Sequence, residues 1–171
     1  MNATAGSEMS ATKNPTTVER KSDRELVVTR TFNGPARIIF DAWTKPELLK
    51  RWWAPRSLGV TLFSCEADLR VGGRYRYVFG REASQSMAFS GVYKEFVPSS
   101  RLVATQLFEP MPSAGEAIVT ATFEEKDGKT RLVVQQLYAS KESLDGAIAS
   151  GMEKGMRETY EQLETLVSSS S

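Results

Sequence analysis

The side chains that could support catalysis are few in this chain of 171 residues. It has no histidine and a single cysteine, Cys65, so the commonest general base at neutral pH and the usual zinc ligands are missing. Ser-His-Asp and Cys-His arrangements are therefore excluded. The acid–base groups that remain are Glu66, Asp68 and a group of tyrosines, and no loop has the closely spaced acidic pattern of a calcium site. We expect no catalytic residue, no metal and no cofactor.

Two features that could suggest chemistry have simpler structural explanations. Cys65 lies in a predicted strand without a cationic neighbour or helix N-terminus to stabilise a thiolate, which favours a buried, unreactive thiol. Gly72-Gly73 lacks the flanking spacing and the following helix of a phosphate-binding loop. The pair indicates a turn that needs positive φ.

Aromatic side chains dominate one face of the predicted strands. Period-two alternation places the following residues on a common face: Tyr75, Tyr77, Phe79, Met87, Phe89, Tyr93 and Phe108. Two interpretations stay open: an ordinary core that faces a helix, or the walls of an apolar pocket whose tyrosine hydroxyls orient a ligand. Arg74 and Arg76 alternate with the tyrosines and should face solvent.

Two glutamines and two tryptophans accompany this aromatic face. Gln106 and Gln136 fall on the same alternating faces, and a buried glutamine needs a partner, which the other glutamine, water or a ligand could supply. Trp52 and Trp53 are adjacent at the end of a short predicted helix, so they cannot point in one direction. We expect one to pack into the core and the other to cover the opening of the sheet.

A long helix is predicted over residues 141–167. Its apolar residues recur at spacings of three and four and form one stripe: Ile148, Met152, Met156, Tyr160, Leu163 and Val167. The flexible thioethers of Met152 and Met156 suit an adaptable wall. Gly151 and Gly155 lie inside this helix, where they indicate either a close approach of the sheet or space for a ligand.

The other elements are mostly strands. Pro35 and Pro46 each begin a short predicted helix within residues 32–55, because the fixed φ of proline suits the first helical turn. Alternation predicts seven strands, at residues 25–32, 59–68, 74–80, 87–96, 102–108, 116–125 and 130–138. Their succession predicts an α+β fold, in which a curved antiparallel sheet wraps around the long C-terminal helix and two short helices follow the first strand.

The composition indicates where the domain begins and ends, which partners are not expected and in which compartment the protein lies. Residues 1–23 and 168–171 are poor in large apolar groups, so we expect them to be disordered on either side of one domain at residues 24–167. Lys and Arg total 22 and Asp and Glu total 21, a balance that gives no reason to expect nucleic acid or a membrane as partner. One unpaired cysteine and the lack of an apolar leader favour the cytoplasm.

An ordered set of motifs connects the chain with a known superfamily. The segments are FDAWT (40–44), RWWAP (51–55), DLRVGG (68–73), RYRY (74–77), GVY (91–93), RLV (101–103), TFEE (122–125) and GMEKGM (151–156). Over about residues 25–167 the chain resembles the START-like, Bet v 1-like domains, and more narrowly the bacterial branch named after the activator of the Hsp90 ATPase. The resemblance implies a helix-grip fold, often with a ligand cavity between sheet and helix and with Trp53 near its mouth. Relatives often carry tryptophan and histidine at positions 106 and 136, where this chain has Gln106 and Gln136.

The function expected from the residues and the resemblance together is non-enzymatic binding of a small hydrophobic or amphipathic molecule. The expected cavity-lining residues are Trp53, Tyr75, Tyr77, Phe79, Met87, Phe89, Tyr93, Gln106, Phe108, Gln136, Ile148, Met152 and Met156. Two alternatives stay open: an interaction module for an Hsp90-type chaperone, and a hydrolase or cyclase of the START-like type. The sequence does not decide between a monomer and a homodimer.

Overall fold

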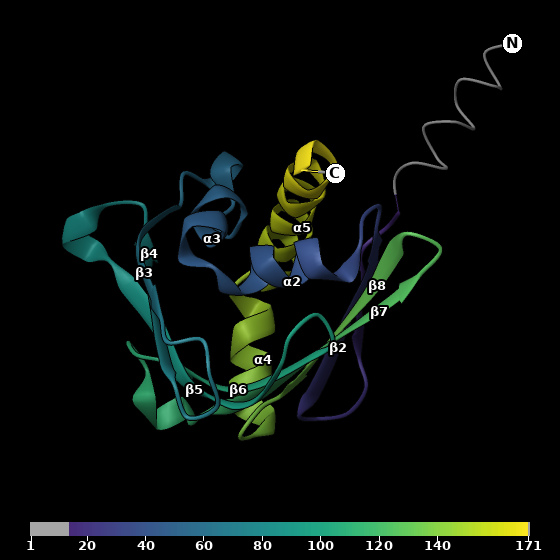
Figure 1. The fold of residues 1–171 in the computed structure, drawn as a ribbon. Coiled ribbons are helices and arrows are strands. Elements are labelled where there is room, and N and C mark those ends of the chain that lie inside the picture. The colour runs from purple at the N-terminus through teal and green to yellow at the C-terminus, as the bar shows by residue number, and fades with distance from the viewer. Residues whose placement is uncertain (1–13, 171) are drawn as a thin grey trace, which may run out of the picture.

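Eight antiparallel strands form one curved sheet in residues 14–170, the part of the chain that the computed structural model describes (Figure 1). In spatial order they are β1 (Thr17–Arg20), β2 (Glu25–Phe32), β8 (Lys129–Leu137), β7 (Ala117–Lys126), β6 (Arg101–Phe108), β5 (Met87–Val97), β4 (Arg74–Gly80) and β3 (Thr61–Ala67). In β2 every second side chain is buried, because successive side chains of a strand point to opposite faces. The sheet therefore has an apolar inner face that other elements must cover.

The helices lie within the curve of the sheet (Figure 1). Among the described residues they are α2 (Ala36–Thr44), α3 (Pro46–Trp52), α4 (Lys141–Ala149) and α5 (Met152–Ser170), with 3₁₀ turns η1 (Arg56–Leu58), η2 (Ala83–Gln85) and η3 (Pro112–Ala114). Phe40 of α2 meets Phe123 of β7 with ring centroids 5.2 Å apart, and Tyr160 of α5 meets Phe32 of β2 at 6.0 Å. These contacts place the main core between the helices and strands β2, β7 and β8.

The predicted α+β helix-grip fold is confirmed, including the two short helices after a strand. Pro35 immediately precedes α2 and Pro46 is the first residue of α3, as the fixed φ of proline favours. The indole of Trp52 is buried and donates to Ala42 O at 2.8 Å, which ties α3 to α2. Trp53 points elsewhere and is half-buried.

The predicted disordered ends differ from the structure where it describes them. Thr17–Arg20 forms β1, an eighth strand that pairs with β2 and places Val18 opposite Val28. Main-chain pairing orders this segment, and composition alone does not reveal such pairing. Ser168 and Ser169 continue α5, where the Ser168 hydroxyl donates to Glu164 Oε2 at 3.0 Å. Residues 1–13 and 171 lie outside the described residues, so that part of the prediction is untested.

The C-terminal helix is two helices rather than one. α4 ends at Ala149, and α5 begins at Met152 after Gly151, whose φ of 85° lies in the left-handed region. Gly151 is therefore a hinge residue between helices and not a mid-helix glycine as predicted. Gly155 does lie inside α5, where a Cβ would lie 3.6 Å from Pro55 Cγ, so it faces the segment after α3.

Candidate functional site

Five aromatic rings lie in mutual contact on the helix side of the sheet. We call them the inner aromatic face: Trp53, Tyr77, Phe79, Phe89 and Phe108. The Trp53 ring is 5.5 Å from Tyr77, 5.1 Å from Phe79 and 6.1 Å from Phe89, measured between centroids. Phe89 in turn lies 5.2 Å from Phe108. All five side chains are half-buried, in contrast to the fully covered rings of the main core.

Strand register explains how these rings come together. Tyr77 of β4 pairs with Phe89 of β5, and Phe89 pairs with Phe108 of β6, so the three lie side by side on one face. Phe79 lies two residues beyond Tyr77 on that face and stacks on Phe89 at 5.3 Å. Trp53 approaches from the end of α3. The alternation in the sequence predicts this arrangement, and the structure brings the residues together.

Tyr75 and Tyr93 continue the aromatic face into a fully buried region. Their rings are 5.4 Å apart, and the Tyr75 hydroxyl donates to Thr105 O of β6. Burial raises the pKa of Tyr93 to about 12 and raises the pKa values of Tyr75 and Tyr77 as well. The Tyr77 hydroxyl offsets part of the rise at Tyr93, although the two hydroxyls do not meet in good hydrogen-bond geometry. These groups stay protonated at neutral pH.

A small polar cluster on the inner face joins β8 to α5, two strands away from the β6 ring Phe108. Tyr138 donates its hydroxyl proton to Gln136 Oε1 at 2.9 Å and also lies 3.8 Å from Met152 Sδ. Gln136 is buried on the inner face, opposite Val119 of β7 and Leu26 of β2. Gln106 is half-buried in β6 opposite Ala117, and its amide makes no hydrogen bond to another described residue. Tyr138 is a site residue that the sequence prediction missed, although it follows Gln136 by one period of the same alternation.

Not every predicted lining residue is enclosed. Met87 is 37% exposed at the start of β5, and Ile148 is 38% exposed near the end of α4. Ile148 leaves the predicted stripe because the helix breaks three residues later. Met156 packs against the core and Met152 is half-buried, so these two lie as predicted along α5.

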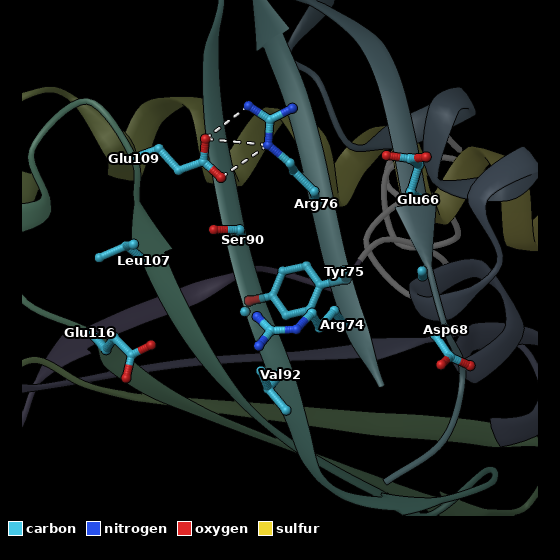
Figure 2. Close-up of a pocket in the computed structure, with 12 residues that line it drawn as sticks. Glu66, Asp68, Arg74, Tyr75, Arg76, Ser90, Val92, Leu107, Glu109 and Glu116 are labelled. Carbon is cyan, nitrogen blue, oxygen red and sulfur yellow. Dashed lines mark hydrogen bonds and ion pairs between the residues drawn. The ribbon is translucent and has the colours of Figure 1, made fainter. Parts of the chain in front are cut away.

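The predicted acid–base residues do not lie on the inner aromatic face. Glu66 and Asp68 are exposed, and both line a hollow of about 600 Å³ on the outer face of β3–β6 (Figure 2). Cys65, beside Glu66 in the chain, is buried opposite Tyr77, and burial raises its thiol pKa to about 11. The thiol is buried, as the sequence predicts, but it does have a cationic neighbour, Lys50 of α3, whose charge offsets part of the rise in pKa. The described residues contain no cluster of three or more His, Cys, Asp or Glu side chains that could hold a metal ion.

The outer hollow is bordered by charged side chains of both signs, and Arg76 and Glu109 form an ion pair across it. Figure 2 shows Arg76 reaching Glu109, with Nε 3.0 Å from Oε2 and Nη2 2.9 Å from Oε1. The guanidinium lowers the pKa of the Glu109 carboxyl. Arg74 and Arg76 both face solvent, as the alternation predicts. The hollow is thus a charged, solvent-facing surface, and the half-buried aromatic surface lies on the other face of the sheet.

A curved antiparallel sheet that holds two short helices and a C-terminal helix, with an aromatic inner face, defines a START-like helix-grip domain. The chain belongs to the family described as activator of Hsp90 ATPase homolog 1-like protein, which matches residues 33–168.

Solved structures support this assignment. A protein from Rhodobacter sphaeroides is 26% identical, with a TM-score of 0.82 over 90% of this chain and 99% of that one. Protein Ms6760 from Mycobacterium smegmatis is 25% identical, with a TM-score of 0.77 over 90% of this chain and 97% of that one. No curated protein matches the chain. None of the described helices is both long and apolar enough to cross a membrane.

Proposed function

We propose that this domain binds a small hydrophobic or amphipathic molecule against the inner aromatic face, between the curved sheet and α5, without catalysis. The observation that carries the proposal is the half-buried state of five rings that already contact one another. The core ring Phe32, by comparison, is completely covered. Aromatic surface left partly in water gains free energy when an apolar ligand covers it.

We include the absence of catalysis in the proposal because of the protonation state of the acidic groups on the inner face. The thiol and the tyrosine hydroxyls on the inner face all have raised pKa values, so they stay protonated near pH 7 and none is available there as a general base. A single buried cysteine is also compatible with the cytoplasm, where we place the protein as part of this proposal.

Native mass spectrometry of freshly purified protein, followed by solvent extraction, tests the proposal. We expect a bound molecule of defined mass, or a rise in melting temperature when apolar compounds are added, because binding only the native state shifts unfolding. Phe89→Ala should weaken binding about tenfold or more, since it removes the central ring of the face. Phe63→Ala is the matched control, because Phe63 is an exposed ring of β3 outside the contacts of the face.

Two results would contradict the proposal. One is an unliganded mass together with no thermal shift across a panel of apolar compounds. The other is equal loss of binding in Phe89→Ala and Phe63→Ala, which would place the ligand elsewhere.

A chaperone partner is the second candidate, and the family description favours it because it names an activator of the Hsp90 ATPase. Purified bacterial Hsp90-type chaperone provides the test. Under this candidate the domain raises the chaperone's ATPase rate and co-migrates with it in gel filtration. An unchanged rate at saturating domain concentration would rule it out.

A further inference from the structure

The inner face carries no charge along half of the sheet. The inward positions of β3, β4, β5 and β6, read from the strand register, are Leu62, Cys65, Ala67, Tyr75, Tyr77, Phe79, Met87, Phe89, Gly91, Tyr93, Phe96, Leu102, Ala104, Gln106 and Phe108. None of these side chains is charged at neutral pH. Trp53, which contacts Tyr77, Phe79 and Phe89, is also neutral.

Charged residues that do point inward lie elsewhere and are already engaged. Arg20 of β1 pairs with Asp145 at 2.8 Å, and Arg30 of β2 pairs with Glu161 at 2.9 Å. Glu125 of β7 accepts the backbone N–H of Ala36 at the start of α2, at 2.9 Å. No inward cation on the described strands is therefore left beside the inner aromatic face to pair with an anionic ligand. The side chain of Lys50 in α3 is exposed, and its charge lowers the pKa of the Cys65 thiol by less than burial raises it.

The surroundings of this face also oppose negative charge. Burial is the largest cause of the raised pKa at every acidic group there, namely Cys65, Tyr75, Tyr77 and Tyr93, and it has the same effect on Tyr138. The desolvation that disfavours a thiolate or phenolate disfavours the carboxylate or sulfonate of a ligand in the same way.

Two uncharged amides lie on the same face of the sheet: Gln106, two residues from Phe108 in β6, and Gln136, two strands further on in β8. Gln136 Oε1 is taken by Tyr138, which leaves its Nε2 without a hydrogen bond to the described residues. The Gln106 amide is half-buried between Ala104 and Phe108 in β6 and makes no hydrogen bond within residues 14–170. Both can bond to a hydroxyl, carbonyl or amide oxygen without a change of charge.

We propose that the ligand of the inner aromatic face is an electrically neutral, largely apolar molecule that carries a hydroxyl, carbonyl or amide group, and that the site rejects anionic amphiphiles such as fatty-acid carboxylates. This inference rests on the proposed function and adds the chemical class of the ligand.

A pair of fluorescent probes that differ by one charged group tests this inference. N-phenyl-1-naphthylamine is neutral, and 1-anilinonaphthalene-8-sulfonate has the same ring system with an added sulfonate. We expect the neutral probe to bind the native protein at least tenfold more tightly at pH 7. Equal or tighter binding of the sulfonate would overturn the inference and leave the proposed function standing. If neither probe binds, the proposed function itself fails, and this inference with it.

Substitutions at two adjacent positions test whether the inner aromatic face is the source of the preference for the neutral probe. Gln106→Lys places a cation beside the inner aromatic face and should strengthen sulfonate binding about tenfold, which narrows or reverses the preference. Leu107→Lys adds the same charge one residue along β6, where the side chain lines the outer hollow instead, and should leave both affinities unchanged. Similar effects of the two variants would show that overall charge, not the inner face, controls binding. Unchanged circular dichroism spectra confirm that both variants fold.

Discussion

The buried charge of Arg30 depends on several polar neighbours. Its side chain is fully buried on the inner face of β2, with Nη1 2.9 Å from Glu161 Oε2 and 3.1 Å from Thr16 Oγ1. Nη2 lies 3.8 Å from Glu164 Oε1, and the guanidinium carbon lies 5.3 Å from the Phe32 ring centroid. A buried cation is tolerated only with such partners, so this cluster joins β2, α5 and the residue just before β1.

Removal of the Arg30 charge should therefore be costly. We expect Arg30→Met to lower the free energy of unfolding by about 3–5 kcal/mol, because Glu164, which is also buried, keeps its charge without a counterion. Urea denaturation measures the change. Arg131→Met is the control, since the exposed Arg131–Glu124 pair contributes less than about 1 kcal/mol. A loss for Arg30→Met as small as that of the control would show that the cluster is not needed for stability.

Gly91 is a second position where a single atom decides the packing. A Cβ there would lie 1.9 Å from Thr105 O and 2.7 Å from the Tyr75 ring, so Gly91 leaves the space through which Tyr75 reaches β6. We expect Gly91→Ala to destabilise the fold by about 3 kcal/mol or more, since backbone must move. A Cβ added at Gly146 in α4 would have no neighbour within 4 Å, so Gly146→Ala should instead stabilise the fold by about 0.5–1 kcal/mol. Melting temperatures that move in the same direction would contradict this interpretation.

At the scale of elements, alternation predicts strands well and helix ends poorly. β4 occupies the residues that the sequence predicts, because its aromatic and charged residues alternate with a period of two. β1 is missed, since a four-residue segment with one apolar side chain, Val18, has no detectable period and is ordered by its pairing with β2. The break before α5 is missed because the apolar spacing continues across Gly151.

Because α4 and α5 are separate helices, alanine substitutions at Gly151 and Gly155 should have opposite effects on stability. Gly151→Ala should lower the free energy of unfolding by about 1–2 kcal/mol, because alanine rarely adopts the φ of 85° that Gly151 has. Gly155→Ala should raise the free energy of unfolding by up to about 1 kcal/mol. The added Cβ would make an ordinary contact with Pro55, and alanine has a higher helix propensity than glycine. Urea denaturation of both variants gives the comparison. A stabilised Gly151→Ala would mean that α4 and α5 can join into the continuous helix that the sequence predicts.

For the whole molecule, the sequence could predict which residues face inward but not how deeply each is covered. Phe89 and Phe108 were placed on one face by alternation, and their pairing in the sheet agrees. Their half-buried state depends on where α5 and Trp53 lie relative to β4–β6, which is a product of the complete packing. Ile148, whose exposure depends on the break between α4 and α5, is a residue for which prediction from spacing failed.

The five tyrosines give the fold a common response to alkaline pH. Tyr75, Tyr77, Tyr93, Tyr138 and Tyr160 are all the tyrosines of the chain, and burial raises the pKa of each, to about 12 for Tyr93 and Tyr138. Between pH 10 and 12 the unfolded chain has lost protons that the native state keeps, so the free energy of unfolding falls as pH rises through this range and is unaffected by these groups below about pH 9. Phenolate absorbance should stay low in native protein at pH 10.5 and appear in one step with the loss of secondary structure. Protein in urea, as the control, should titrate near pH 10, and native protein that did the same with its fold intact would show that the aromatic interior is open to water.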